Sequence, residues 1–210
     1  MLLLVAIAWA CDPAVLASLP IPTTIDATPI VEKGTGYLGD IRIAGARVTY
    51  RSAHPLAEWA PVLERPEDQD VWHPKQFGTR RAERLGPATL FQQVDISVLF
   101  GAITIRRQVV AGITWLERSP DVVRNCWRAQ DPASYEAQIA QWKDDAPFQL
   151  HGMGSWDLRA LPDGGTSVSY TFWADTGAMP AKVQAWAMSR TLPDLMGAFE
   201  AYVGSPTAPR

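Results

Sequence analysis

Apolar and polar residues alternate along several stretches of this chain between positions 41 and 174. A period of two puts apolar side chains on one face of a β-strand and polar side chains on the other. The stretches that follow this pattern are 41–50, 90–98, 102–116, 122–129, 148–158 and 166–174. Asp163-Gly164-Gly165 suits a tight turn between the last two, because glycine tolerates a positive φ. The pattern predicts a series of antiparallel strands, each with one face in water.

The C-terminal region changes to a helical period. From Ala181, apolar residues recur at steps of four and three, as Ala185, Met188, Leu192, Leu195, Phe199 and Tyr202. This stripe predicts a helix over 181–202, roughly 30 Å long at ~1.5 Å per residue. A coiled coil would give a similar stripe, but the preceding strands favour a helix that packs on a sheet. Pro180 suits its first turn, and Pro193 is expected to kink it. Shorter helices are predicted over 55–63 and 132–143.

The composition of both ends differs from that of the middle. Residues 1–10 form an apolar segment that is typical of a secretory signal, and it is shorter than the roughly 20 residues that span a bilayer. Residues 11–35 are rich in proline and threonine and are expected to form an extended tether. Residues 204–210 are expected to form a flexible tail. The folded domain is therefore placed at 36–203.

The signal-like segment predicts export, to the periplasm or by secretion. Ala8-Trp9-Ala10 fits the small-x-small cleavage pattern, and Cys11 follows it directly. A lipid anchor on Cys11 is the less favoured form of export, because Trp9 is bulky for its position. A buried N-terminal strand or helix is the alternative to a signal.

Charge and cysteine content narrow the function classes. The 210 residues include 19 Lys or Arg and 22 Asp or Glu, a net charge of −3, which lacks the basic excess of nucleic-acid binders. Two cysteines and three histidines are too few for a disulfide framework and have no zinc-ligand spacing, so we expect no metal and no cofactor. The charged stretch 64–84 is predicted to be a solvated loop.

A curved sheet with a long helix across its concave side encloses space that is hard to fill. With nine tryptophans in the chain, the lining of that space is expected to be apolar and aromatic. Such a space either packs shut or holds an apolar ligand. Burying ~400 Å² of a lipid at ~25 cal/mol per Å² gives on the order of 10 kcal/mol before the costs of association.

The order of elements resembles the START domain over roughly 40–203. The stretches that carry the resemblance are Gly154-Ser155-Trp156-Asp157-Leu158, Pro162-Asp163-Gly164-Gly165-Thr166, Asp175-Thr176-Gly177-Ala178-Met179-Pro180 and Ile105-Arg106-Arg107-Gln108-Val109-Val110. The resemblance implies an α+β helix-grip fold, in which a curved antiparallel β-sheet wraps around a long C-terminal helix and encloses an apolar cavity. Gln108 departs from the family, which often has Asp there. Ile113 and an apolar residue near Val94 stand where some members carry a buried Arg–acid pair.

The residues expected to contact a ligand combine this resemblance with the inward faces of the strands and helix. They are Arg107, Ile113, Trp115, Trp127, Trp156, Tyr170, Phe172, Met188, Leu192, Leu195 and Phe199. Arg107 on an apolar face either meets a polar ligand group or reaches from the rim into water. For the tryptophans, ordinary core packing is the alternative.

The resemblance implies binding, and as an extension transport, of a lipid, sterol or acyl chain by an exported, bacterial-type monomer in transient membrane contact. A polyketide cyclase or aromatase of the same fold is the second hypothesis, with its acid or base among His151, Asp157, Asp95 and Tyr170. A Ser155–His151 couple is excluded because four strand positions separate the two residues by roughly 13 Å. A ligand-free secreted interaction module with a solid core is the third hypothesis.

Overall fold

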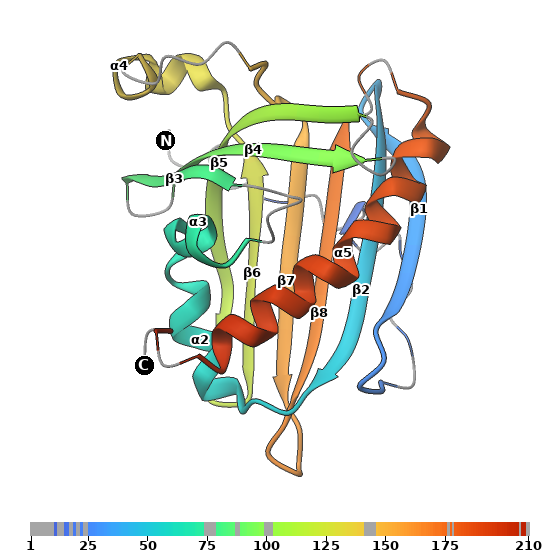
Figure 1. Cartoon of the computed structure of the whole chain (residues 1–210), viewed down its shortest axis with the longest axis vertical. Coiled ribbons are helices and arrows are strands. Elements are labelled where there is room, and N and C mark those ends of the chain that lie inside the picture. Colours follow the sequence, from blue (N-terminus) through green and yellow to red (C-terminus); the bar gives the residue numbers. More distant parts are fainter. Residues whose placement is uncertain are drawn as a thin grey trace, which may run out of the picture.

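The strands of this protein form one antiparallel sheet, seen in a computed structural model (Figure 1). The structure describes residues 11, 15–16, 19, 22, 25–73, 79–86, 89–98, 103–140, 146–175, 177, 179–205 and 207–208; at 79–80, 89–98 and 103–105 it describes the backbone alone. Within this part of the chain the strands are β1 (Ile30–Leu38), β2 (Ile41–Ser52), β3 (Thr79–Gly86), β4 (Thr89–Val98), β5 (Ile103–Arg118), β6 (Val122–Ala129), β7 (Gly152–Ala160) and β8 (Thr166–Asp175). Their spatial order is β1-β2-β8-β7-β6-β5-β4-β3.

The helices lie mainly between the second and third strands and at the C-terminal end. They are α2 (Leu56–Leu63), α3 (Gln69–Trp72), α4 (Glu136–Ile139) and α5 (Ala181–Val203), with short 3-10 turns at Pro66–Asp68 and Pro132–Tyr135. Figure 1 shows α5 running diagonally across the sheet, with α2 near its C-terminal end. The helix continues through Pro193, the position at which the sequence predicts a kink. This arrangement is the predicted helix-grip fold.

The main hydrophobic core lies between the concave face of the sheet and the two helices α2 and α5. Trp59 of α2 is fully buried, and its ring contacts Trp156 of β7 at 6.4 Å and Phe199 of α5 at 5.4 Å between centroids. The helical spacing of Leu56, Trp59 and Leu63 turns these side chains to the same side. One aromatic cluster thus joins both helices to the sheet.

Polar contacts fix the C-terminal half of α5 against the sheet. The hydroxyls of Tyr50 and Ser52 on β2 donate to the Glu200 carboxylate at 3.1 and 2.6 Å. The hydroxyl of Tyr202 donates to Asp68 at 2.9 Å. These bonds, together with the buried Phe199, hold this end of the helix to both β2 and the segment before α3.

Described residues of the stretch 11–35 contact the outer face of the sheet or belong to β1, which differs from the extended tether expected there. Cys11 forms a disulfide with Cys126 of β6. The guanidinium of Arg47 on β2 donates to the backbone carbonyls of Leu16 and Leu19. Leu19 is buried against Trp173, Ile43 and Met153. Residues 30–35 belong to β1. Apolar burial and hydrogen bonding to Arg47 therefore offset the entropy that an extended tether would keep.

Two further expectations differ at the edges of the fold. The charged stretch 64–84 contains the start of β3, an edge strand whose side chains are free to be polar, as in the Arg81–Glu83 pair at 2.9 Å. In the predicted tail 204–210, Ala208 is only 9% exposed and packs against the main core. Residues 1–10 lie outside the described part of the chain, so the signal segment stays a prediction.

Candidate ligand-binding cavity

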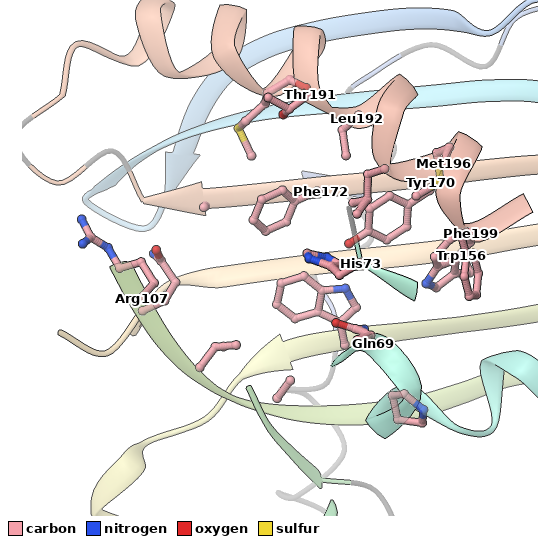
Figure 2. A pocket seen from close by; sticks show the side chains of 18 of the residues that line it. Gln69, His73, Arg107, Trp156, Tyr170, Phe172, Thr191, Leu192, Met196 and Phe199 are labelled. Carbon is pink, nitrogen blue, oxygen red and sulfur yellow. Dashed lines mark hydrogen bonds between the residues drawn. The ribbon is translucent and has the colours of Figure 1, made fainter. Parts of the chain in front are cut away.

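A cavity of about 460 Å³ lies between the concave face of the sheet and α5. Its lining comes from β5, β6, β7 and β8 on one side and from α2, α3 and α5 on the other (Figure 2). Most of the lining is apolar. The volume falls within the range of roughly 300–1,000 Å³ that is usual for small-molecule sites. The interior is therefore hollow at the place where the sequence predicts either a cavity or a solid core.

Aromatic side chains form the sheet side of the cavity in two rows. Trp127 and Phe172 have ring centroids 5.6 Å apart, and both are in register with Gly154 of β7, which lies between their strands. In the next row, Trp156 and Tyr170 stack at 4.4 Å. The alternation of each strand turns these rings to the same face, so neighbouring strands present them side by side.

The helix side of the cavity consists of flexible and aromatic apolar residues on one stripe of α5. Met188, Leu192 and Met196 are buried there and face the sheet. Phe199 closes one end, with its ring 5.1 Å from Trp156 and 4.4 Å from Trp72. The stripe that the sequence predicts thus forms both the core contact and the roof of the cavity.

The other end of the cavity is polar. Gln149 donates to the Asp175 carboxylate, and the side chain of Gln184 on α5 donates to the Asp175 backbone carbonyl at 2.9 Å. Figure 2 shows Arg107 at this end of the view, away from Trp156 and Phe199, with its guanidinium turned outward. It donates to the carbonyl of Arg106 at 2.8 Å in an exposed hydrogen bond. The rim interpretation of Arg107 therefore fits better than a buried ion pair.

Tyr170, in the aromatic floor of the cavity, has a pKa well above the ordinary value of a tyrosine. Burial raises the pKa of its phenol to about 12, and a hydrogen bond with Trp127 acts in the opposite direction. The group therefore stays protonated at neutral pH and presents an uncharged hydroxyl to the cavity.

All the residues predicted to contact a ligand line this cavity, except Trp115. Trp115 faces a smaller hollow that is also lined by Ala60 of α2 and by Glu64, which follows α2, and the Arg118 guanidinium lies 3.7 Å from its ring centre. The register of β5 also shifts between Trp115 and Glu117. Trp115 thus lies outside the lining of the main cavity, in a hollow that Ala60 of α2 also lines, and its contact with a ligand stays a prediction. Whether the other residues touch a ligand stays a prediction.

Several lining residues were missed. Val109, Ala111 and Asn125 continue the same strand faces as Ile113 and Trp127, so the alternation contained the signal for them. Gln69, Trp72 and His73 come from α3 and its end, a four-residue helix without a recognisable pattern. Asp175 is the last residue of β8, and Gln149 lies in the segment before β7. Only the folded sheet brings these side chains to one rim.

The candidate acid and base residues whose side chains are described do not gather in the cavity. Asp157 forms ion pairs with Arg124 at 3.3 Å and with Arg159 at 2.9 Å, outside the cavity lining. His151 is also outside the lining, and the side chain of Asp95 is not among those described. Tyr170 remains, and its raised pKa disfavours proton transfer at neutral pH.

The part of the chain that the structure describes contains no candidate metal site and no candidate membrane-spanning helix. Its His, Cys, Asp and Glu residues form no group of three or more that could hold a metal ion. None of its helices combines the length and the apolar character that a membrane crossing requires.

Solved structures of known proteins resemble this fold over most of the chain. A STAR-related lipid transfer protein from Xanthomonas axonopodis gives a TM-score of 0.58 at 14% identity, covering 82% of this chain and 99% of that chain. A START superfamily protein from Mycobacterium smegmatis gives 0.54 at 13% identity, with 76% and 96% covered. Human StAR-related lipid transfer protein 5 gives 0.53 at 12% identity, with 81% and 87% covered.

No protein-family model matches the sequence, and no curated protein matches it. Identities of this size carry information on the fold, and the architecture agrees with it in two respects. The sheet is antiparallel throughout, and α5 crosses its concave face. The chain therefore has the START-like helix-grip fold.

Proposed function

We propose that this protein binds a hydrophobic small molecule, such as a lipid, a sterol or an acyl chain, in the cavity under α5. The observation that carries the proposal is the apolar, aromatic-lined volume of about 460 Å³ between sheet and helix. A folded protein does not keep a dry apolar space of this size without cost, because its lining forfeits packing contacts. A guest that fills the space restores those contacts. Two structures of similar fold are named as lipid transfer proteins, which supports the same ligand class.

The same geometry favours a carrier over an enzyme. Binding draws its free energy from burial of apolar surface, about 25 cal/mol per Å², and needs no catalytic group. The polar rim at Gln149, Asp175 and Gln184 gives one end of the cavity contact with water. A ligand with an apolar body and a polar end would leave or enter there. Transfer of a ligand between membranes follows if the rim meets a bilayer transiently.

Native mass spectrometry of gently purified protein tests the binding step. We expect a mass above that of the polypeptide, and organic extraction should release the bound molecule. A titration of delipidated protein with a fluorescent fatty acid should saturate at one ligand per chain. Protein that is ligand-free on purification and takes up neither the fatty acid nor a fluorescent sterol would contradict the proposal.

Transport requires a separate measurement, since binding alone does not move a ligand. Donor vesicles that contain a self-quenched fluorescent lipid are mixed with acceptor vesicles and a catalytic amount of the protein. Dequenching should accelerate in proportion to protein concentration. If the protein binds the lipid but the dequenching rate does not change, binding is supported and transfer between membranes is contradicted.

Export belongs to the same proposal. Disulfides persist in oxidising compartments, so the Cys11–Cys126 bond supports passage out of the cytosol. The bond occupies the Sγ atom of Cys11 that a thioether lipid anchor would need, so an anchored form would lack it. Intact-mass analysis of protein expressed from the full sequence should show cleavage after Ala10 and no added lipid. An uncleaved chain in the cytosol would contradict export.

A further inference from the structure

Asn125 is a buried polar residue in the wall of the cavity. It lies on β6, between Trp115 of β5 and Trp156 of β7 in the register of the sheet. Its side chain is 4% exposed and belongs to the cavity lining. No hydrogen bond joins its side-chain amide to another described residue, and the amide is open to the cavity rather than sealed in the core. Asn125 thus presents an unpaired donor and an unpaired acceptor to an apolar space.

An unpaired amide in this position is unfavourable for folding alone. Buried polar groups normally have partners, and an unmet one costs more stability than an apolar side chain of similar size would. Among the described residues, neither neighbour in register, Trp115 or Trp156, forms a hydrogen bond with the Asn125 side chain. No described residue supplies a partner for Asn125, and the cavity can supply one, as water or as an atom of the bound molecule.

The surroundings indicate what kind of atom this is. Tyr170, in register with Trp156 on the far side, carries a neutral hydroxyl. Arg65, on the α2 side of the lining, is paired with Asp68 at 3.0 Å, so its charge is compensated. Arg107 stands eight residues before Trp115 on β5, roughly 27 Å along the strand at ~3.4 Å per residue. An ionised headgroup would find its counter-charge at that rim and not beside Asn125.

We propose that Asn125 hydrogen-bonds one uncharged oxygen of the bound molecule, a hydroxyl or a carbonyl. The cavity would then select hydrophobic molecules that carry such an oxygen over hydrocarbons of the same shape. This inference rests on the proposed function, because it assigns a ligand class to the same cavity. The oxygen belongs either to a ring system, as in a sterol, or to a substituted acyl chain.

Matched probe pairs separate these two sources. Cholestanol and cholestane differ by one ring hydroxyl, and 12-hydroxystearate and stearate differ by one chain hydroxyl. Each probe is titrated into delipidated protein with tryptophan fluorescence as the readout. In the wild-type protein, the hydroxylated member of at least one pair should bind about tenfold more tightly. The pair that shows the preference identifies the source of the oxygen.

Asn125→Leu removes both hydrogen-bonding groups and keeps the number and branching of the side-chain heavy atoms. The preference for the hydroxylated probe should disappear, while binding of its hydrocarbon-like partner is retained. Ser155→Ala, on the outer face of β7 and in register with Cys126, is the matched control and should keep the wild-type preference. Asn125→Ala serves as a second variant if the leucine disturbs folding, with the same expected loss of preference.

Thermal unfolding of the ligand-free variants separates recognition from structure. Asn125→Leu should melt at or above the wild-type temperature, because it removes an unpaired buried amide. A lower melting temperature together with an unchanged probe preference would overturn the inference and make Asn125 a structural residue. Equal binding of both members of each pair by the wild-type protein would also overturn it while leaving the proposed function intact. If the protein binds none of the four probes, both the inference on Asn125 and the proposed binding function are contradicted.

Discussion

Trp127 of β6 lies flat over Gly154 of β7, so that a Cβ atom at Gly154 would overlap the indole Nε1. The same Cβ atom would stand 2.7 Å from the backbone carbonyl oxygen of Thr171. Glycine is therefore required there by space, and its missing side chain lets the indole lie along the floor of the cavity toward Phe172. The shape of the cavity depends on an absent side chain as much as on the aromatic rings that are present.

Gly154→Ala should consequently distort the floor. We expect a loss of about 1–3 kcal/mol in the free energy of unfolding, typical of overpacking, and weaker binding of a fluorescent fatty acid. Gly197→Ala on α5 is the matched control, since no atom lies within 4 Å of its Cβ position. That change should stabilise the helix by about 0.5–1 kcal/mol. Denaturant melts of both variants check this, and wild-type stability in Gly154→Ala would refute the steric argument.

Leu195→Trp should obstruct the cavity from the helix side. Leu195 lines the cavity and is only partly buried, so a larger ring has space to turn inward. Uptake of a fluorescent lipid should fall at least about tenfold while the circular dichroism spectrum is unchanged. Val183→Trp, at a position on the same helix that is 45% exposed, should bind as the wild type does. Equal uptake by both variants would mean that the ligand does not occupy this part of the cavity.

Tyr170 makes stability sensitive to alkaline pH. Because its pKa in the folded protein is raised to about 12, against about 10 in an unfolded chain, its contribution is complete below pH 10 and is lost as the pH rises toward 12. At pH 11 the loss amounts to about 1.4 kcal/mol, or ~3–5 °C in the melting temperature. Between pH 8 and pH 11, the free energy of unfolding of Tyr170→Phe should therefore fall by about 1.4 kcal/mol less than that of the wild type.

Thermal melts at the two pH values measure this difference. Burial also raises the pKa of Tyr50, so the variant should still lose part of its stability at high pH. An identical pH dependence in wild type and variant would show that the Tyr170 phenol ionises as freely in the folded state as in the unfolded one.

The disulfide should stabilise the whole domain. Cys11 and Cys126 are 115 residues apart in sequence, so their bond closes a long loop and restricts the unfolded chain. Cys126→Ser should cost about 2–4 kcal/mol. Cys11→Ser should cost the same, and the double variant no more than either, because one bond is lost in each case. Reductant should lower the melting temperature of the wild type and leave the variants unchanged; additive losses would contradict this.

The sequence by itself determined the inner strands and α5. The alternation predicts which side chains of β5, β6 and β8 face the cavity, whereas β2 is buried on both faces from Ile43 to Tyr50 and its outer face could not be recognised in this way. The stripe on α5 arises in the same way at a helical period. Because the cavity wall is simply the inward face of these elements, most of its residues follow from the same periodicities. The resemblance of element order to START domains then gives the fold.

Only the tertiary structure decided what lies at the edges and between the strands. β1 and β3 are the two edge strands of the sheet. Edge strands are partly open to solvent, so their sequences need not alternate between apolar and polar residues, and the pattern did not predict them. The bond between Cys11 and Cys126 joins segments that no local pattern connects. Whether Asn125 has a partner depends on distances across three strands, and Trp115 lines a separate hollow beside Ala60 of α2. The hydrophobic period of a strand or helix predicts the direction in which a side chain points. Which residue it contacts depends on the distant segments that the tertiary structure places beside it.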